Sequence, residues 1–347
     1  MTVKVNPFAD RMAGFVRLLR KRRLEAALVC TEPNVKALTG IDCDNAIVVV
    51  RSDGDATFYT DFRYIPMVER TAPWIRLRDI SKFSVRSISR LGFEEGITVE
   101  KYGRLQKKCK GAEFFPLSDG LAGLRAVKTA CEADRLRASA KLNDEIWNEA
   151  RKSFRPGMTE KAMARVIRHL MIEKGDGEAF ETIVCVGANA AECHHVPDDT
   201  VWTGDEPVLV DMGVKLDGYC SDMTRNIVPE SASRKYRRIY RLVLEANKLG
   251  IREAKPGMKA SELDMTVRNF LKEKGFEKEF GHSLGHGVGI EIHEHPGVSR
   301  KSKAVLEPGM AITIEPGIYI PGELGVRIED LILIAEKGCE VISHSAK

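Results

Sequence analysis

The chain of 347 residues lacks the features of secreted and membrane proteins. No apolar run approaches the roughly 20 residues needed to span a bilayer, and the N-terminus carries no apolar signal core. The eight cysteines form no C-x-x-C pair and no closely spaced framework, which favours reduced thiols over disulfides. We therefore predict a cytoplasmic protein without a membrane partner.

Motifs of several common catalytic sites are also missing. H-E-x-x-H does not occur, which excludes the helical zinc-protease arrangement, and neither G-x-x-x-x-G-K-[ST] nor G-x-S-x-G is found. The glycines at positions 285, 287 and 289 lack the spacing of a dinucleotide site and the acidic residue about 20 positions further on. A nucleotide site and a serine nucleophile on an elbow turn are therefore not expected.

Composition and charge indicate a soluble globular protein. Hydrophobic residues make up 43% and charged residues 30% of the chain, and the net charge is only +4. A basic run at residues 20–23 falls in the last turn of a predicted helix, where positive charge complements the helix dipole. We predict no nucleic-acid partner, and the length favours two domains.

Short strands and helices alternate in the first third of the chain, which predicts an α/β domain over residues 1–122. Glycines interrupt this pattern at residues 118–123, so we place a domain boundary there and a second domain over residues 123–347. The first domain shows no catalytic cluster of histidines, cysteines or acids. Its predicted elements are helices at 10–23 and 81–91 and strands at 26–30, 46–50, 56–59, 74–77, 97–100 and 113–117.

The second domain contains an internal repeat. Three landmarks recur with an offset of 100 residues, and each copy runs from helices into glycine-rich strands and then into an acidic hairpin. The repeat predicts two α+β halves that are related by a pseudo-twofold axis. The matching landmarks are residues 155–158 and 255–258, residues 173–175 and 273–275, and Phe180 and Phe280.

Each acidic hairpin brings two carboxylates together. Residues 208–226 turn near Asp217-Gly218 and place Asp211 nearly opposite Asp222, and residues 311–330 turn near Pro321-Gly322 and place Glu315 nearly opposite Glu329. Carboxylates that face each other across a ladder repel, and burying them unpaired costs more still. Four such groups on two apolar hairpins predict bound cations, and we expect two.

The histidines are concentrated near these hairpins. Six of the eight lie in two short segments, each of which leads into an acidic hairpin. A lone histidine is more often structural than functional, but a cluster beside unpaired acids favours a metal or catalytic site. The six are His194, His195, His282, His286, His293 and His295.

At these residues the chain resembles the creatinase/prolidase/methionine-aminopeptidase superfamily of pita-bread metallopeptidases. The strings D-M-G, S-D-M-T-R, G-H-G-V-G, E-P-G and V-R-I-E-D carry the resemblance in the expected order. L-T-G at residues 38–40 and T-D-F-R-Y at 60–64 are similar to the N-terminal domain of the Xaa-Pro aminopeptidase and prolidase branch. The resemblance implies an α/β N-terminal domain followed by a pita-bread catalytic domain, and a homodimer.

The resemblance implies a dinuclear metal site. Asp211 and Glu329 would bridge the two ions, Asp222 and Glu315 would complete the carboxylates, and His286 would bind one ion. Four carboxylates and one imidazole form a hard donor set that suits Mn²⁺, with Co²⁺ as a second candidate. A hydroxide that bridges the ions would attack the scissile carbonyl.

Further roles follow from the same resemblance. Glu315 would also handle the proton of the water, His293 would stabilise the oxyanion, and His194 would steer the substrate and proton transfer. Phe180, His282 and Tyr319 would form the walls of a small pocket for the proline ring. Arg327, two residues before Glu329, would orient a carboxylate.

One position departs from the pattern of many relatives. An arginine that can bind the C-terminal carboxylate of a dipeptide often follows the H-E-x-P string, whereas this chain has Gly297 there and Arg300 and Lys301 further on. We therefore predict an Xaa-Pro aminopeptidase that acts on longer peptides with proline at the second position. The alternatives are an Xaa-Pro dipeptidase (prolidase) and a non-catalytic peptide-binding module of the same fold.

Overall fold

The computed structural model describes residues 8–347, and residues 1–7, in which the sequence shows no signal core, lie outside the described residues. The chain divides into two compact units with the boundary between Arg125 and Ala126. The boundary predicted at residues 122/123 falls inside α5 (Ser118–Ala126) and stays a prediction. In the part of the chain that is described, no helix combines the length and the apolar character that crossing a membrane requires.

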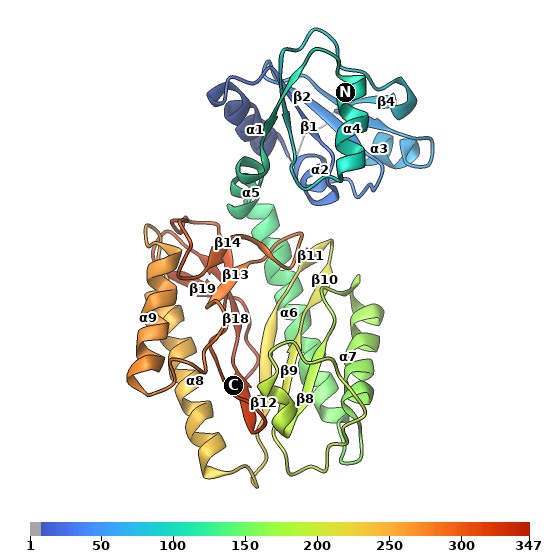
Figure 1. The fold of residues 1–347 in the computed structure, drawn as a ribbon. Helices are drawn as coiled ribbons and strands as arrows, with labels where there is room; N and C mark the ends of the chain where they lie inside the picture. The colour runs from blue at the N-terminus through green and yellow to red at the C-terminus, as the bar shows by residue number, and fades with distance from the viewer. Residues whose placement is uncertain (1–7) are drawn as a thin grey trace. The chain divides into compact units, whose positions relative to one another are not determined.

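The first unit is a mixed six-stranded sheet with helices on both faces (Figure 1). Alternate residues of β1 face two different cores: Ala27 and Val29 pack with α1, and Ala26 and Leu28 pack on the α4 side. The strand order is β4 (Arg76–Asp79), β3 (Ala56–Thr60), β2 (Ile47–Arg51), β1 (Ala26–Val29), β5 (Arg90–Phe93) and β6 (Glu113–Pro116). The helices are α1 (Ala9–Lys21), α2 (Glu32–Thr39), α3 (Ile65–Thr71) and α4 (Val99–Lys108).

Two predicted elements of this unit are wrong. The helix predicted over residues 81–91 is instead a single 3₁₀ turn, η1 (Ile80–Lys82), then irregular chain whose Phe83, Val85 and Ile88 are buried against the sheet, and then the start of the strand β5 at Arg90. The strand predicted over residues 97–100 is instead the start of α4, because the Thr98 hydroxyl accepts the backbone N–H of Lys101 and caps a helix there.

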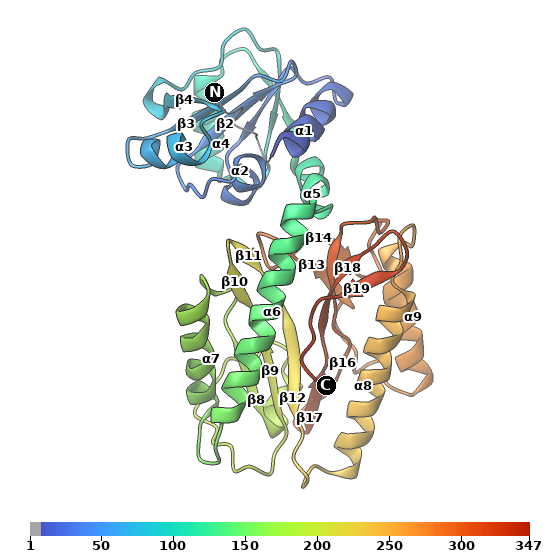
Figure 2. The ribbon, with the colours of Figure 1, turned by 180° about the vertical axis from the view of Figure 1, so that it is seen from behind.

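The second unit consists of two similar halves. Each half has two packed helices, α6 (Ala130–Ser153) with α7 (Glu160–Lys174) and α8 (Arg234–Glu253) with α9 (Ala260–Glu273). Figure 2 shows α6 and α8 lying over one face of the strands. Each half has its own buried apolar core, in which these helices pack against the strands that follow them.

The strands of the second unit form short antiparallel sheets and hairpins. The first half contains β7 (Gly177–Glu178), β8 (Ile183–Val186), β9 (Val208–Met212), β10 (Val214–Leu216), β11 (Tyr219–Cys220) and β12 (Met223–Ile227), with the 3₁₀ helix η2 (Gly187–Ala191). The second half contains β13 (Gly285–Gly287), β14 (Glu294–Val298), β15 (Ala311–Ile314), β16 (Gly317–Ile320), β17 (Leu324–Arg327), β18 (Asp330–Ile334) and β19 (Cys339–Val341).

The sequence repeat is visible as repeated backbone geometry. Gly157 and Gly257 both have positive φ, at 94° and 81°, which glycine adopts without strain. The N–H of Gly157 donates to the carbonyl of Trp202 over 2.8 Å, and the N–H of Gly257 donates to that of Leu306 over the same distance. The Pro-Gly-Met string is therefore the turn that leads into α7 in one half and α9 in the other.

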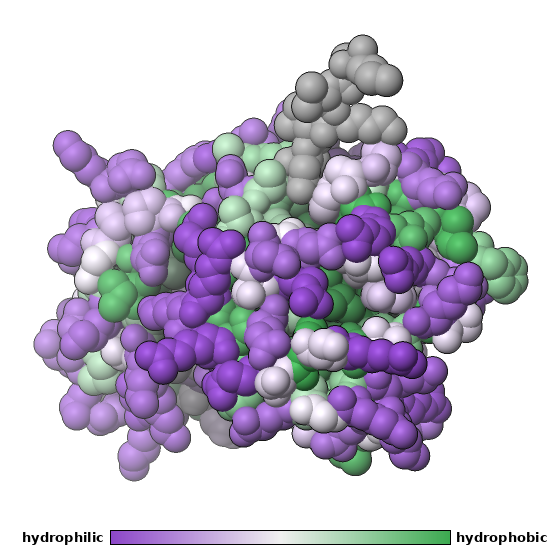
Figure 3. Space-filling model, turned by 90° about the horizontal axis from the view of Figure 1, so that it is seen from above, coloured by the Kyte–Doolittle hydropathy of each residue, from purple (hydrophilic) through white to green (hydrophobic). Residues whose placement is uncertain are grey.

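Exposed large apolar side chains are scattered over the described residues. Phe62 and Val99 of the first unit are among the most exposed, at 79% and 88%. The face in Figure 3 is mostly hydrophilic, with apolar side chains in small separate groups. Isolated apolar residues of this kind are normal on soluble proteins.

Candidate metal centre

The first acidic hairpin places Asp211 and Asp222 on one face. β9 and β12 pair so that Asp211 lies opposite Thr224, and Asp222 is therefore its diagonal neighbour rather than its direct partner. The predicted turn lies at Asp217 and Gly218, both of which have positive φ. The two carboxylates thus reach the same space from neighbouring strands.

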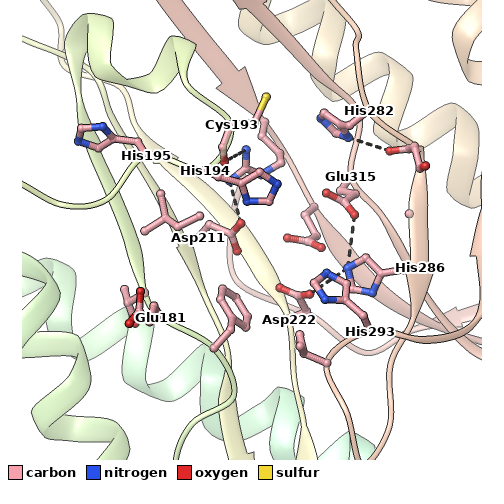
Figure 4. A pocket seen from close by; sticks show the side chains of 18 of the residues that line it. Glu181, Cys193, His194, His195, Asp211, Asp222, His282, His286, His293 and Glu315 are labelled. Carbon is pink, nitrogen blue, oxygen red and sulfur yellow. Dashed lines mark hydrogen bonds and ion pairs between the residues drawn. The ribbon is translucent and has the colours of Figure 1, made fainter. Parts of the chain in front are cut away.

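The second hairpin does the same with two glutamates. The ladder between β15 and β18 ends at Ile314 opposite Asp330, so Glu315 and Glu329 occupy the next positions of the same register. All four acids and His286 line one cavity of about 540 Å³. The structure therefore brings the five predicted metal ligands together, and Figure 4 labels all of them except Glu329.

His286 is held with one ring nitrogen free for a ligand bond. Its Nδ1 is 3.1 Å from the carbonyl oxygen of Gly287 and donates to it, so Nε2 keeps its lone pair. Nε2 lies 3.5 Å from Asp222 Oδ2 and 3.5 Å from Glu315 Oε1. Burial, together with His293, lowers the pKa of His286 to about 4, which keeps the imidazole neutral as metal binding requires.

Burial and mutual repulsion raise the pKa of three of the acids. Burial, then Glu329 and Asp211, raise the pKa of Asp222, and burial, then Glu315, raise that of Glu329. Burial also raises the pKa of Glu315, to about 8. A set of carboxylates that cannot all ionise alone is stabilised by divalent cations.

Two further observations fit bound cations. Asp211 Oδ1 is buried and has no hydrogen-bond partner, although buried carboxylate oxygens are normally satisfied. Single ligand atoms of Asp222, His286 and Glu329 lie within 4.8 Å of one another. The donor set of oxygens and one imidazole nitrogen is the kind that hard divalent ions prefer.

Arg327 holds the carboxylate side of the centre in place. Its Nη2 donates to Asp211 Oδ2 over 2.7 Å, its Nε to Thr224 Oγ1 over 3.0 Å, and its Nη1 to Tyr319 Oη over 2.9 Å. Arg327 is only 3% exposed. Arg327 therefore has partners in both halves, as expected of a residue that orients a carboxylate.

Two threonines support the ligands and were not predicted. Thr224 Oγ1 donates to Glu329 Oε2 over 2.8 Å, and Thr313 Oγ1 donates to Glu315 Oε1 over 3.2 Å. Each lies two residues from a ligand in the sequence, Thr224 after Asp222 and Thr313 before Glu315. Residues two apart in a strand share a face, so this spacing could have indicated that the two threonines lie beside the ligands.

The predicted substrate residues lie around the same cavity. Phe180, His282, His194 and His293 line it, whereas Tyr319 is 7% exposed and is not among the lining residues. The ring nitrogen Nε2 of His282 is 2.9 Å from the Tyr319 hydroxyl. Burial, then the charge of Arg327, lower the pKa of His282 to about 4, so His282 is neutral and accepts this bond.

The histidines near the ligands point in different directions. The ring of His293 packs against that of His286, with centroids 4.3 Å apart. In Figure 4, His194 lies among Cys193, Asp211 and Glu315, whereas the ring of His195 points away from the metal ligands. His194 and His293 are thus placed beside the acids, and the roles predicted for them stay predictions.

Comparisons with known proteins identify the family. Residues 134–336 match the sequence model of metallopeptidase family M24, and residues 11–127 match the creatinase/prolidase N-terminal domain. The fold and site are those of a two-domain metallopeptidase. The chain belongs to metallopeptidase family M24, which confirms the predicted superfamily and fold class.

Similar proteins cover nearly the whole chain. A Bacillus subtilis protein named "Uncharacterized peptidase YqhT" is 35% identical over 93% of this chain and 95% of its own length. The prolidase structure from Pyrococcus horikoshii OT3 is 33% identical, with a TM-score of 0.92 over 97% of this chain and 99% of that one. The X-Pro aminopeptidase structure from Thermotoga maritima is 27% identical, with a TM-score of 0.86 over 94% and 98% of the two chains.

Proposed function

We propose that the chain is an Xaa-Pro peptidase that depends on two divalent cations and, within that class, an Xaa-Pro aminopeptidase. Asp211, Asp222, His286, Glu315 and Glu329 would hold the two ions, with Mn²⁺ first and Co²⁺ second. When bound, such ions lower the pKa of a water and polarise the scissile carbonyl. The buried acids, the neutral His286 and the unpartnered Asp211 Oδ1 support this assignment.

The chain's own residues supply proton transfer and charge stabilisation. Glu315, besides holding a metal ion, would also accept the proton of the attacking water. His293, packed on His286, would donate to the developing oxyanion, and His194 would guide the substrate and the proton that the proline nitrogen needs to leave. Phe180 and His282 line the cavity and would contact the proline ring.

The surroundings of Gly297 are the observation that favours an aminopeptidase over a dipeptidase. Gly297 lines the cavity, and a Cβ built on it meets no atom within 4 Å, so the cavity is open at this point. Among the described residues that line the cavity, the only arginine or lysine is Arg327, whose guanidinium already binds Asp211 and Tyr319. Open space without a free cation suits a peptide that continues beyond proline better than a terminal carboxylate.

An Xaa-Pro dipeptidase is the second candidate. It is favoured by the relatives, because a Pyrococcus horikoshii protein named Xaa-Pro dipeptidase is 32% identical over 97% of this chain. Arg300 and Lys301 are exposed and do not line the cavity, so a dipeptidase would need another group to bind the carboxylate. Homodimer formation and a cytoplasmic location stay predictions.

A comparison of Ala-Pro with Ala-Pro-Ala, with Mn²⁺ or Co²⁺ added to metal-stripped protein, tests the proposal. An aminopeptidase releases alanine from the tripeptide with a clearly higher kcat/KM than from the dipeptide. Preference for the dipeptide would reverse the assignment within the class. No hydrolysis of either peptide, with near-stoichiometric metal bound, would contradict the proposed function and favour a non-catalytic module.

A further inference from the structure

His195 belongs to the histidine cluster and lines the edge of the cavity, yet its ring points away from the metal ligands (Figure 4). Its Nε2 lies 2.7 Å from Glu160 Oε2, and the two side chains are 9% and 0% exposed. Glu192, on the surface, is 3.5 Å from the other ring nitrogen. His195 is therefore a partner of the buried glutamate that begins α7.

The Glu160 carboxylate fastens the segment between β8 and residue 198 at several points. Its Oε1 accepts the N–H of Val186 over 2.7 Å and the Asn189 side-chain amide over 2.9 Å. Its Oε2 accepts His195 Nε2 and the N–H of Asp198 over 3.0 Å. The N-terminus of a helix also favours a negative charge at this position.

The group of Glu160, His195 and Asp198 is not a second metal site. Ligand atoms of Glu160, His195 and Asp198 lie within 4.8 Å of one another, but each oxygen of Glu160 already accepts two hydrogen bonds. The contrast with Asp211, whose Oδ1 is buried and has no partner, separates an internal anchor from a metal ligand. Glu160 is thus a structural carboxylate with a complete set of donors.

The anchored segment carries His194 to the cavity. Its other side is fixed by the second half: the Cys193 carbonyl accepts Arg327 Nη1 over 3.5 Å, and the backbone of Gly325 lies so close to Ala190 that a Cβ would fall 1.7 Å from its carbonyl oxygen. The segment is thus held on one side by hydrogen bonds to Glu160 and on the other by contacts with the second half, and His194 and His195 lie between these two sets of contacts. The position of His194 therefore depends on the bond between its neighbour and Glu160.

We propose that His195 is a positioning residue, which acts through its buried bond to Glu160 to hold His194 over the metal centre. The inference rests on the proposed function, in which His194 guides the substrate and the proton. The bond is charge-assisted because its acceptor is a carboxylate, and such bonds are about twice as strong as neutral ones; protonation of the imidazole turns it into an ion pair. Burial lowers the pKa of His195, but its contacts with Glu160 more than offset this and leave it raised, which agrees with a charged pair.

The decisive variants are His195→Leu, which cannot donate to Glu160, and His195→Gln, whose amide can. We expect His195→Leu to lower kcat for Ala-Pro-Ala by about tenfold with a smaller change in KM, because displacement of an active-site group by about 1 Å costs up to about 100-fold. His195→Gln should recover most of this loss. The matched control is His169→Gln, since His169 is 80% exposed on the same helix as Glu160.

A double-mutant cycle with His194→Ala separates positioning from general stability. If His195 acts through His194, the loss caused by His195→Leu largely disappears in the His194→Ala background, because neighbouring residues that act together are not additive. An equal loss in both backgrounds, or a kcat within twofold of wild type, overturns the proposal. Hydrogen exchange of residues 187–198 must also become faster in His195→Leu, and unchanged exchange there contradicts it even if no Xaa-Pro peptide is a substrate.

Discussion

Both halves of the second unit use a buried carboxylate on a helix to hold a segment that carries a cavity histidine. In the first half, Glu160 of α7 accepts His195. In the second half, Asp264 of α9 accepts Arg268, whose guanidinium also donates to the carbonyls of Phe280 and His282 over 2.8 Å each. The two anchors lie at different positions of the repeat, because at the offset of 100 residues Glu160 corresponds to Ala260 and Asp264 to Ala164, and they use different cationic partners.

The difference between the partners determines where pH can act. A guanidinium stays charged at every pH a protein survives, whereas an imidazole loses its charge near neutrality. The anchor of the second half should therefore be permanent, and that of the first half should weaken as pH rises. Four predictions test this comparison.

The largest effect should come from removing one metal ligand from either half. Asp222→Asn and Glu329→Gln should each lower kcat by more than about 100-fold, because even residues that only support a ligand typically cost about 10- to 100-fold in activity or metal affinity. Metal content, measured by mass spectrometry after dialysis, should fall in both. Full metal content and activity in one variant alone would show that only one half contributes to the centre.

The permanent anchor should contribute the most to stability. Arg268→Met leaves Asp264 buried without its partner, and breaking a buried ion pair in this way typically costs about 3–5 kcal/mol. Urea unfolding of the metal-loaded protein measures the loss, and Asp264→Asn combined with Arg268→Met removes both charges as a control. A double variant as unstable as Arg268→Met would contradict the role of the charge pair.

A smaller, matched effect is expected from two buried asparagines. Asn143 of α6 donates to the carbonyl of Met212 over 3.0 Å, and Asn247 of α8 donates to that of Ile314 over 2.9 Å. Each carbonyl neighbours a metal ligand in the sequence. Replacing either asparagine by alanine should cost about 1–3 kcal/mol, because a buried acceptor loses its donor. Unfolding free energies that differ strongly between the two variants would show that the halves are not equivalent here.

The smallest effect should be a pH dependence confined to the first half. The folded state raises the pKa of His195 above its ordinary value of 6.5. The free energy of folding that comes from the charged imidazole is therefore fully present below pH 6.5 and is lost as the pH rises through the pKa of the folded state. Glu160, Glu192 and Asp198 are the charged groups that face the ring. The difference in unfolding free energy between wild type and His195→Gln should therefore shrink from pH 6 to pH 9. A constant difference would contradict a charged pair.

The parts of the site that follow local patterns could be predicted from the sequence. The prediction that the four acids lie together used only strand alternation, two glycine turns and the internal repeat. In the structure, Asp211, Asp222, Glu315 and Glu329 all line one cavity. The supporting bonds could not be predicted, because contacts such as that of Arg327 with Asp211 join residues far apart in the chain. In the first unit, the 81–91 segment fails as a helix because its apolar residues pack on the sheet as irregular chain.

The order of the ligands along the chain has a consequence for synthesis. Asp211 and Glu329 are separated by 118 residues (329 − 211), and Arg327, which binds Asp211, also lies near the far end of this stretch. A ribosome releases the first acidic hairpin long before the second exists. The proposed dinuclear centre therefore cannot assemble on a nascent chain, or on a truncated one, that does not yet include Glu329, so the enzyme becomes active only after both acidic hairpins have been synthesised.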